Sequence, residues 1–119
     1  MKEHNIIQEK SFAFAIRIIN LYKYLIAEKK EFVLSKQLLR SGTSIGANVE
    51  EAIGGQSKKD FIAKISIAYK EARETMYWVK LLKETSYLHE KEADNILSDA
   101  EELCKILASI LITTKNNKS

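Results

Sequence analysis

The sequence predicts an all-α protein, folded as an antiparallel up-down-up-down four-helix bundle. Proline is absent from its 119 residues, and all four glycines fall within 42–55, so most of the chain lacks the usual turn residues. Apolar residues recur every three or four positions over long stretches, which is the period of one helix face. The breaks between these stretches are short, and short connections make successive helices antiparallel neighbours. We therefore expect one domain spanning residues 1–119.

The first two helices are expected at residues 5–29 and 35–53. Ser35 is expected to cap the second helix, because a serine hydroxyl accepts a hydrogen bond from the first turn. The glycine pair 54–55 is expected to end it, since glycine readily adopts the left-handed conformation that closes many helices. The apolar row of this helix consists of Leu38, Gly42, Ile45, Val49 and Ala52.

The last two helices are expected at residues 58–85 and 90–114. Ser57 is the predicted cap of the third helix, with Asp60 three residues later in the capping-box position. We interpret His89 as part of the turn or cap before the fourth helix. The apolar rows of these helices consist of Phe61, Ile65, Ala68, Ala72, Met76, Val79 and Leu82, followed by Ile96, Ala100, Leu103, Leu107 and Ile110.

Two glycines in the second helix predict a close helix crossing. Gly42 and Gly46 each weaken a helix by about 1 kcal/mol relative to alanine, so we expect another backbone to lie against them. Ile67, Trp78 and Leu81 add apolar surface to the third helix beyond its core row. This surface indicates either an interface between copies of the chain or a broad apolar stripe in a slim bundle.

Composition and charge limit the classes of function. Hydrophobic residues make up 45% of the chain and charged residues 29%, as in ordinary globular proteins. We expect no membrane contact, because no apolar run approaches the roughly 20 residues of a spanning helix, and a cytoplasmic location, because no signal peptide opens the chain. Residues 1–88 carry fifteen basic against ten acidic side chains, whereas 89–114 carry two against six. This asymmetry is typical of an anionic partner, of head-to-tail self-association or of a mixed solvated surface.

The candidate residues for chemistry predict no enzyme, no cofactor and no metal. A metal site in a four-helix bundle needs inward carboxylates and Glu-x-x-His pairs, and the chain has no such pair. Cys104 lies in an apolar row, where burial raises the pKa of a thiol and makes it inert. Gly42 and Gly46 form no phosphate loop, because neither a strand nor a Gly-Lys-Ser/Thr sequence flanks them.

A polar row on the second helix has two interpretations. It consists of Ser41, Ser44, Asn48 and Glu51. These side chains either line a small polar ligand site or form a structural network, in which serine hydroxyls bond to their own helix and the longer side chains reach a neighbour. A ligand-binding or enzymatic function would require a formed polar pocket around them.

A row on the third helix is the candidate nucleic-acid interface. At alternating spacings of four and three, it contains Lys59, Ala63, Ser66, Lys70, Arg73, Tyr77 and Lys80, and we call it the basic stripe. Phosphates bind spaced positive charges, and tyrosine stacks on unpaired bases. Glu71 and Glu74 are adjacent, and Glu74 lies four residues from Lys70, in position to neutralise it. The stripe therefore predicts either nucleic-acid contact or a solvated face.

The run from Leu34 to Leu82 carries a family resemblance. Its core SGTSIGANVEEA and the following FIAKISIAYKEARET closely resemble the 23S rRNA intervening-sequence proteins, bacterial four-helix bundles encoded within large-subunit ribosomal RNA genes. The resemblance covers essentially the whole chain, with the first and last helices matching by length and periodicity. The family is also similar to the accessory variability determinants of diversity-generating retroelements, which work with a reverse transcriptase and its RNA.

The resemblance implies an up-down bundle that assembles as a homopentamer around a central channel. It implies no enzymatic activity, provides no catalytic residues, and makes nucleic acid the expected partner. We therefore expect a non-enzymatic, homo-oligomeric scaffold that contacts RNA or an RNA-handling protein such as a nucleic-acid enzyme. The alternative is a purely structural or protein-interaction module without nucleic-acid binding.

Overall fold

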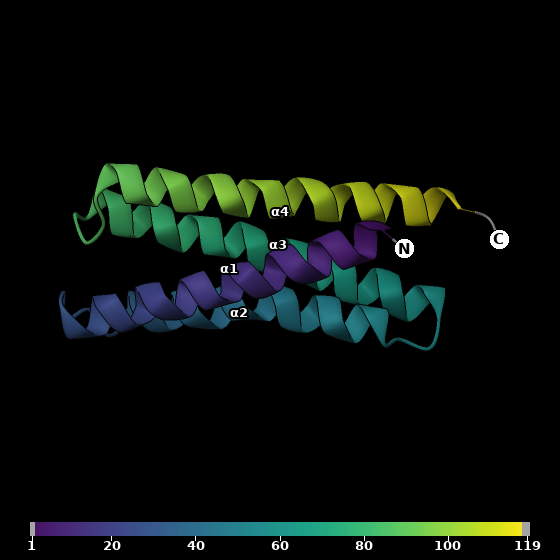
Figure 1. The fold of residues 1–119 in the computed structure, drawn as a ribbon, viewed down its shortest axis with the longest axis horizontal. Helices are drawn as coiled ribbons and strands as arrows, with labels where there is room; N and C mark the ends of the chain where they lie inside the picture. The colour runs from purple at the N-terminus through teal and green to yellow at the C-terminus, as the bar shows by residue number, and fades with distance from the viewer. Residues whose placement is uncertain (1, 118–119) are drawn as a thin grey trace.

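Four long helices form the structure, a computed structural model that describes residues 2–117, with side chains from residue 6 onward. They are α1 (Lys2–Ala27), α2 (Leu34–Ile53), α3 (Lys58–Glu84) and α4 (Glu90–Asn116), and no strand occurs in this part of the chain. Their ends differ from the expected ones by no more than three residues. The result is a rod of 51 × 21 × 19 Å (Figure 1).

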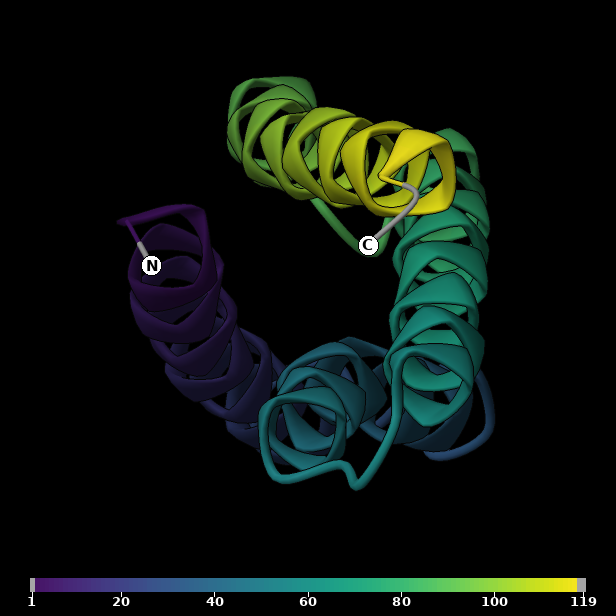
Figure 2. The same ribbon diagram turned by 90° about the vertical axis from the view of Figure 1, so that its right-hand side faces the viewer.

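The helices lie side by side along the rod. The connections α1–α2 and α3–α4 lie at one end and the connection α2–α3 at the other (Figure 1). Viewed along the rod, the order is α1, α2, α3, α4 around a shared interior (Figure 2). The consecutive pairs pack extensively, whereas α1 and α4 share a smaller contact. All-α class and bundle-like packing therefore agree with the sequence prediction.

The predicted apolar rows form the core. The whole α2 row is buried, as are all five predicted residues of α4. In α3 the row is buried except at Phe61 and Met76, which pack partly exposed against the core. The helical period in the sequence therefore identified the buried face of each of these helices.

The start of α2 differs from the prediction. Ser35 lies inside the helix rather than at its cap, and its hydroxyl donates to the carbonyl of Glu31 at 2.7 Å. The carboxylate of Glu31 supplies the capping oxygens instead, accepting from the N–H groups of Val33, Leu34 and Ser35 at 3.2, 3.0 and 2.6 Å. Glu31, three residues before the first residue of α2, thus satisfies three of the backbone donors at the start of the helix.

The helix C-termini also correct the sequence analysis. No glycine has positive φ; Gly54 has φ −84° and ends α2 without the left-handed conformation expected of it. Lys30 (φ 55°) and Ser86 (φ 69°) adopt that conformation after α1 and α3. After α3 the N–H of Tyr87 donates to the carbonyl of Leu82, five residues back, at 2.9 Å, which is the long hydrogen bond of a Schellman closure. After α1 the N–H of Glu31 donates to the carbonyl of Leu25, six residues back, at 3.1 Å.

The predicted cap of α3 is confirmed. Ser57 has extended backbone angles, and its hydroxyl accepts from the N–H of Asp60 at 3.1 Å. His89 precedes α4 as its N-cap residue, with no side-chain capping bond. The sequence identified these residues because their signals lie within one helical turn.

The two helical glycines of α2 lie where α1 crosses it. A Cβ atom on Gly46 would lie 3.3 Å from the backbone oxygen of Ser11, and one on Gly42 would lie 2.7 Å from a side-chain carbon of Ile18. Ile18 is completely buried, so it has little freedom to move aside. The absence of side chains at these two positions lets α1 approach α2 closely.

Candidate nucleic-acid interface

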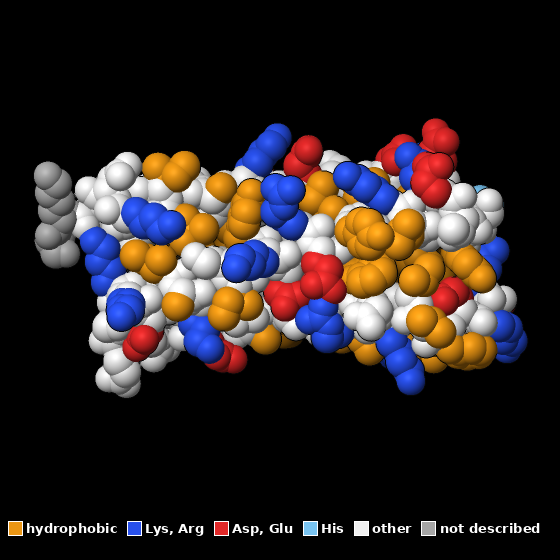
Figure 3. Space-filling view, turned by 180° about the vertical axis from the view of Figure 1, so that it is seen from behind, with side chains coloured by type: hydrophobic (Ala, Val, Ile, Leu, Met, Phe, Trp, Pro, Cys, Tyr) orange, Lys and Arg blue, Asp and Glu red, His pale blue; other side chains and the backbone are white. Residues whose placement is uncertain are grey.

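The basic stripe lies on the outward side of α3. Its five predicted contact residues, Lys59, Lys70, Arg73, Tyr77 and Lys80, are all exposed. The face of the molecule that α3 occupies is turned toward the viewer in Figure 3, where basic and hydrophobic side chains alternate along the rod. The stripe extends from the first turn of α3 almost to its end, about 30 Å at 1.5 Å per residue.

The lysines of the stripe pair with no acidic side chain in the part of the chain whose side chains are described. Among the side chains that the structure describes, no carboxylate lies within ion-pair distance of Lys59, Lys70 or Lys80. Lys83, which lies off the stripe, is in contrast paired with Asp94 of α4 at 2.8 Å. The ammonium groups of the stripe lysines are therefore available to an anionic partner.

The acidic side chains next to the stripe, Glu71 and Glu74, are paired with a residue outside it. Arg40 of α2 donates to both carboxylate oxygens of Glu71 at 3.3 Å and also pairs with Glu74. The indole N–H of Trp78 donates to the same Glu74 carboxylate at 2.9 Å. The expected Glu74–Lys70 pair is absent, because Arg40 and Trp78 hold the carboxylate toward α2.

This arrangement keeps Glu74 ionised. The hydrogen bond from Trp78, followed by that from Arg40, holds the pKa of Glu74 below its ordinary value. A carboxyl group with a lowered folded-state pKa contributes stability that is present above its unfolded pKa and is lost as the pH falls through the folded value. The contribution of the Glu74 carboxylate to the contact between α2 and α3 is therefore present at neutral pH and is lost in acid.

A pocket adjoins the stripe between α3 and α4. Its volume is about 380 Å³, and it is lined by Tyr69, Arg73, Met76, Tyr77, Lys80, Glu101 and Cys104. The sulfur atoms of Met76 and Cys104 lie 4.0 Å apart. Burial raises the pKa of the Cys104 thiol, which is therefore neutral at physiological pH. The pocket combines an apolar interior with two cations and one carboxylate.

The polar row of α2 is bonded within the bundle. Ser44 donates to the carbonyl of Arg40 at 2.6 Å, and Asn48 donates to that of Ser44 at 2.8 Å. Ser41 is buried and accepts a hydrogen bond from Thr75 of α3 at 2.9 Å, while Glu51 pairs with Lys64 of α3 at 2.7 Å. These contacts correspond to the structural interpretation, in which the row joins α2 to itself and to α3.

The predicted contact residues on the other side of α3 differ in exposure. Ile67 is exposed, whereas Trp78 and Leu81 are half-buried, and Trp78 packs against the core. The first helix presents a further apolar row, in which Phe12 is 67% exposed and Ile16 is 48% exposed. Both α1 and α3 therefore carry large apolar side chains on the surface of the single chain, as do α2 at Ile53 and α4 at Ile112.

Sequence reasoning missed the residues that complete this region. Tyr69, Met76, Glu101 and Cys104 line the pocket, yet none belongs to the stripe, and the last two come from α4. The spacing within one helix carries no information about which α4 side chains face α3. Arg40 was likewise missed, because its two partners follow it by 31 and 34 residues.

Comparison with known proteins identifies relatives that match most of the chain. The sequence model of the family described as 23S rRNA-intervening sequence protein matches residues 3–109. A protein of unknown function from the S23 ribosomal protein family of Bacteroides thetaiotaomicron has a similar crystal structure, with a TM-score of 0.91 and 53% sequence identity over 92% of this chain and 97% of that one. No curated protein matches the chain.

Proposed function

This chain belongs to the family of 23S rRNA-intervening sequence proteins, and from this premise we propose that it is a homopentameric, non-enzymatic scaffold that binds RNA through the basic stripe of α3. The observation that carries the proposal is the unpaired state of Lys59, Lys70 and Lys80 among the described side chains, beside acids that Arg40 already occupies. Unpaired lysines contribute the most to phosphate binding, because no existing ion pair has to be broken. Their contact with phosphates also releases the counterions condensed on the RNA.

Assembly is the second part of the proposal. The exposed side chains of Phe12, Ile16 and Ile67 support it, because apolar surface of this kind is typical of contacts between chains. A pentamer would also repeat a stripe of modest charge five times, and such multivalency raises the affinity for one long RNA without any new contact. The rotational symmetry of a closed ring would place every stripe on an equivalent face.

The resemblance to retroelement accessory proteins extends the proposed partners to an RNA-handling enzyme. Those proteins work with a reverse transcriptase and its RNA, so a scaffold of this kind would act in a protein–RNA complex. A location in the cytoplasm, where such RNA is available, belongs to the same proposal. Within residues 2–117, none of the helices combines the length and the hydropathy of a membrane-spanning segment.

The test is RNA binding measured by fluorescence anisotropy over a range of salt concentrations. We expect wild-type protein to bind a labelled single strand with an affinity that falls steeply as salt increases. The double variant Lys59→Glu/Lys70→Glu should weaken binding for all sequences alike and reduce the slope of log affinity against log salt by about 1 or more. Gel filtration with light scattering should give five times the chain mass of 13.6 kDa.

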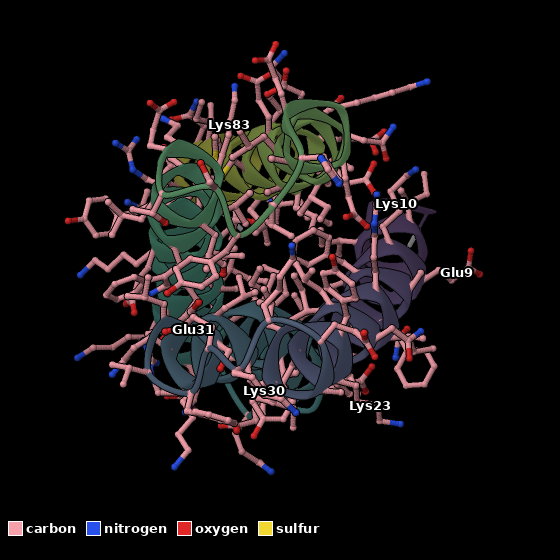
Figure 4. All side chains as sticks on the ribbon, turned by 90° about the vertical axis from the view of Figure 1, so that its left-hand side faces the viewer. Glu9, Lys10, Lys23, Lys30, Glu31 and Lys83 are labelled. Atoms are coloured by element: carbon pink, nitrogen blue, oxygen red, sulfur yellow. The ribbon has the colours of Figure 1, made fainter. Side chains whose placement is uncertain are left out.

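The matched control is Lys23→Glu/Lys36→Glu, which changes the charge equally at two exposed positions of α1 and α2. Lys23 lies on the side of the bundle away from α3 (Figure 4). We expect this control to retain most of the affinity and the salt slope. Equal losses in both variants, or wild-type protein that binds no RNA at low salt, would contradict the stripe and favour a protein-interaction module. A monomeric mass would contradict the assembly.

A further inference from the structure

The pocket between α3 and α4 has the composition of a site for one nucleic-acid base. Its volume of about 380 Å³ lies within the range of small-ligand sites. Met76 and Cys104 supply apolar, polarizable surface, and both residues pack against the core. A planar heterocycle fits such a site better than a charged or strongly hydrated group, since its faces are apolar and its edges polar.

Two side chains at the pocket are held in positions suited to stacking. Tyr77 is 56% exposed as a residue, and its ring meets that of Trp78 edge to face, with 5.2 Å between the ring centroids. Tyr77 therefore remains accessible to a ligand despite its contact with Trp78. The guanidinium of Arg73 lies 5.9 Å from the centroid of the Tyr69 ring and donates to its hydroxyl at 3.4 Å. Aromatic rings and guanidinium planes are the surfaces on which proteins stack unpaired bases.

Glu101 supplies the polar edge of the site. Its carboxylate is 60% exposed, and its contact with Lys105, at 3.9 Å, is long for an ion pair, so both oxygens are available to a ligand. An ionised carboxylate only accepts hydrogen bonds. Among the four RNA bases, guanine alone presents two adjacent donors on its pairing edge, the ring imino group and the exocyclic amino group. Adenine, cytosine and uracil each offer one donor group beside an acceptor.

We propose that this pocket binds one unpaired guanine base of an RNA, with the base stacked on Tyr77, its pairing edge on Glu101 and the adjoining phosphates on Arg73 and Lys80. This inference rests on the proposed function, because the last two residues belong to the basic stripe. The preferred RNA is then single-stranded or bulged, since a base within a duplex presents neither its face nor its pairing edge.

The experiment compares short oligouridine strands that carry one central guanosine, inosine or adenosine. Inosine lacks only the exocyclic amino group of guanosine, so this pair isolates a single hydrogen bond. By fluorescence anisotropy we expect guanosine to bind about five- to tenfold more tightly than inosine or adenosine, the lower part of the usual range for base discrimination. Tyr77→Ala should weaken binding of the guanosine strand by about fivefold or more.

Glu101→Gln tests the specificity, and Glu102→Gln is its matched control. Glu102 is the next residue, is 53% exposed, and pairs with Lys10 of α1 rather than facing the pocket. Both variants remove one negative charge. We expect Glu101→Gln to abolish the preference for guanosine over inosine, while Glu102→Gln preserves it. A parallel gain in affinity for all strands would mean that Glu101 only repels phosphate, and it would overturn the proposal.

The inference and the proposed function can fail separately. If RNA binding depends on salt and on Lys59 and Lys70, but guanosine and inosine strands bind alike, the guanine site is overturned and the RNA scaffold stands. If no RNA binds, ligand-observed NMR with guanosine monophosphate tests whether the pocket binds guanine by itself. Saturation transfer from wild-type protein that is lost in Glu101→Gln supports the site, and its absence from wild-type protein overturns it.

Discussion

Helix α1 packs in two different ways on its two neighbours. Against α2 it lies so close that a single Cβ atom on Gly42 would meet side-chain carbons of Ile18 at 2.7 and 2.8 Å. Against α4 it is separated by cavities of about 300 and 330 Å³. The ion pairs of Arg17 with Asp99 and of Lys10 with Glu102 line the first of them. We call the second contact the α1–α4 seam.

The difference shows that side-chain size at the contact sets the distance between helices. Glycine on α2 removes the only atoms that would keep the α1 backbone away. Long charged side chains on both helices line the seam, and they must remain near water because isolated buried charges are costly. One helix therefore has a rigid contact that tolerates no added atom and a loose contact that tolerates several.

The largest expected effect is that of Gly46→Leu. The backbone oxygen of Ser11, which a Cβ atom would approach to 3.3 Å, cannot move without displacing α1. We expect a loss of about 3 kcal/mol in the free energy of unfolding, the upper end of the usual cost of overpacking, measured by urea denaturation. Ala47→Leu, at an exposed neighbouring position, should stay within about 0.5 kcal/mol. A higher melting temperature with unchanged oligomer mass would contradict the close crossing.

A smaller effect is expected for Gly42→Ala, which adds one methyl group. Alanine favours a helix by about 1 kcal/mol over glycine, so an open site would be stabilised. Because the added methyl group would lie 2.7 Å from a side-chain carbon of the completely buried Ile18, we expect a net destabilisation instead. The free energy of unfolding should fall by about 1 to 2 kcal/mol, measured by thermal or urea denaturation.

The matched control for this methyl group lies on the other side of α1. Ala13 is exposed and lines the 300 Å³ cavity of the seam, so Ala13→Leu adds three carbons where space exists. We expect its stability to remain within about 0.5 kcal/mol of wild type. If Gly42→Ala stabilises the protein, or if Ala13→Leu costs as much as Gly42→Ala, the contrast between the two contacts is wrong.

The smallest effect is expected for the ion pair of the seam. Arg17 and Asp99 are in contact at 2.6 Å, but their side chains are 33% and 49% exposed. A double-mutant cycle with Arg17→Met and Asp99→Asn should give a coupling of about 0.5 kcal/mol that decreases as salt is added. A salt-independent coupling above about 2 kcal/mol would indicate a desolvated pair and a seam as tight as the glycine crossing.

Local signals in the sequence were sufficient for much of the fold. Helix length, the buried rows and the cap at Ser57 follow from residues within a few positions of one another, because helical period and capping are set within one or two turns. The basic stripe was found for the same reason, since all its residues lie on one helix. The five predicted contact residues of the stripe are exposed in the structure, as an interface requires. RNA binding by the stripe and the assembly of the chain remain predictions.

Tertiary structure decided the paths of the connections and the contacts between helices. Glu31, rather than Ser35, caps α2, and Lys30 and Ser86, rather than the glycines, adopt left-handed angles, because the path of each connection is imposed by the helices it joins. The pairing of Arg40 with Glu71 and Glu74, which leaves Lys70 free of them, depends on the rotation and axial shift of α2 relative to α3. Glu101 likewise faces the α3 pocket because of how α4 packs, and helical spacing alone carries no information on that packing.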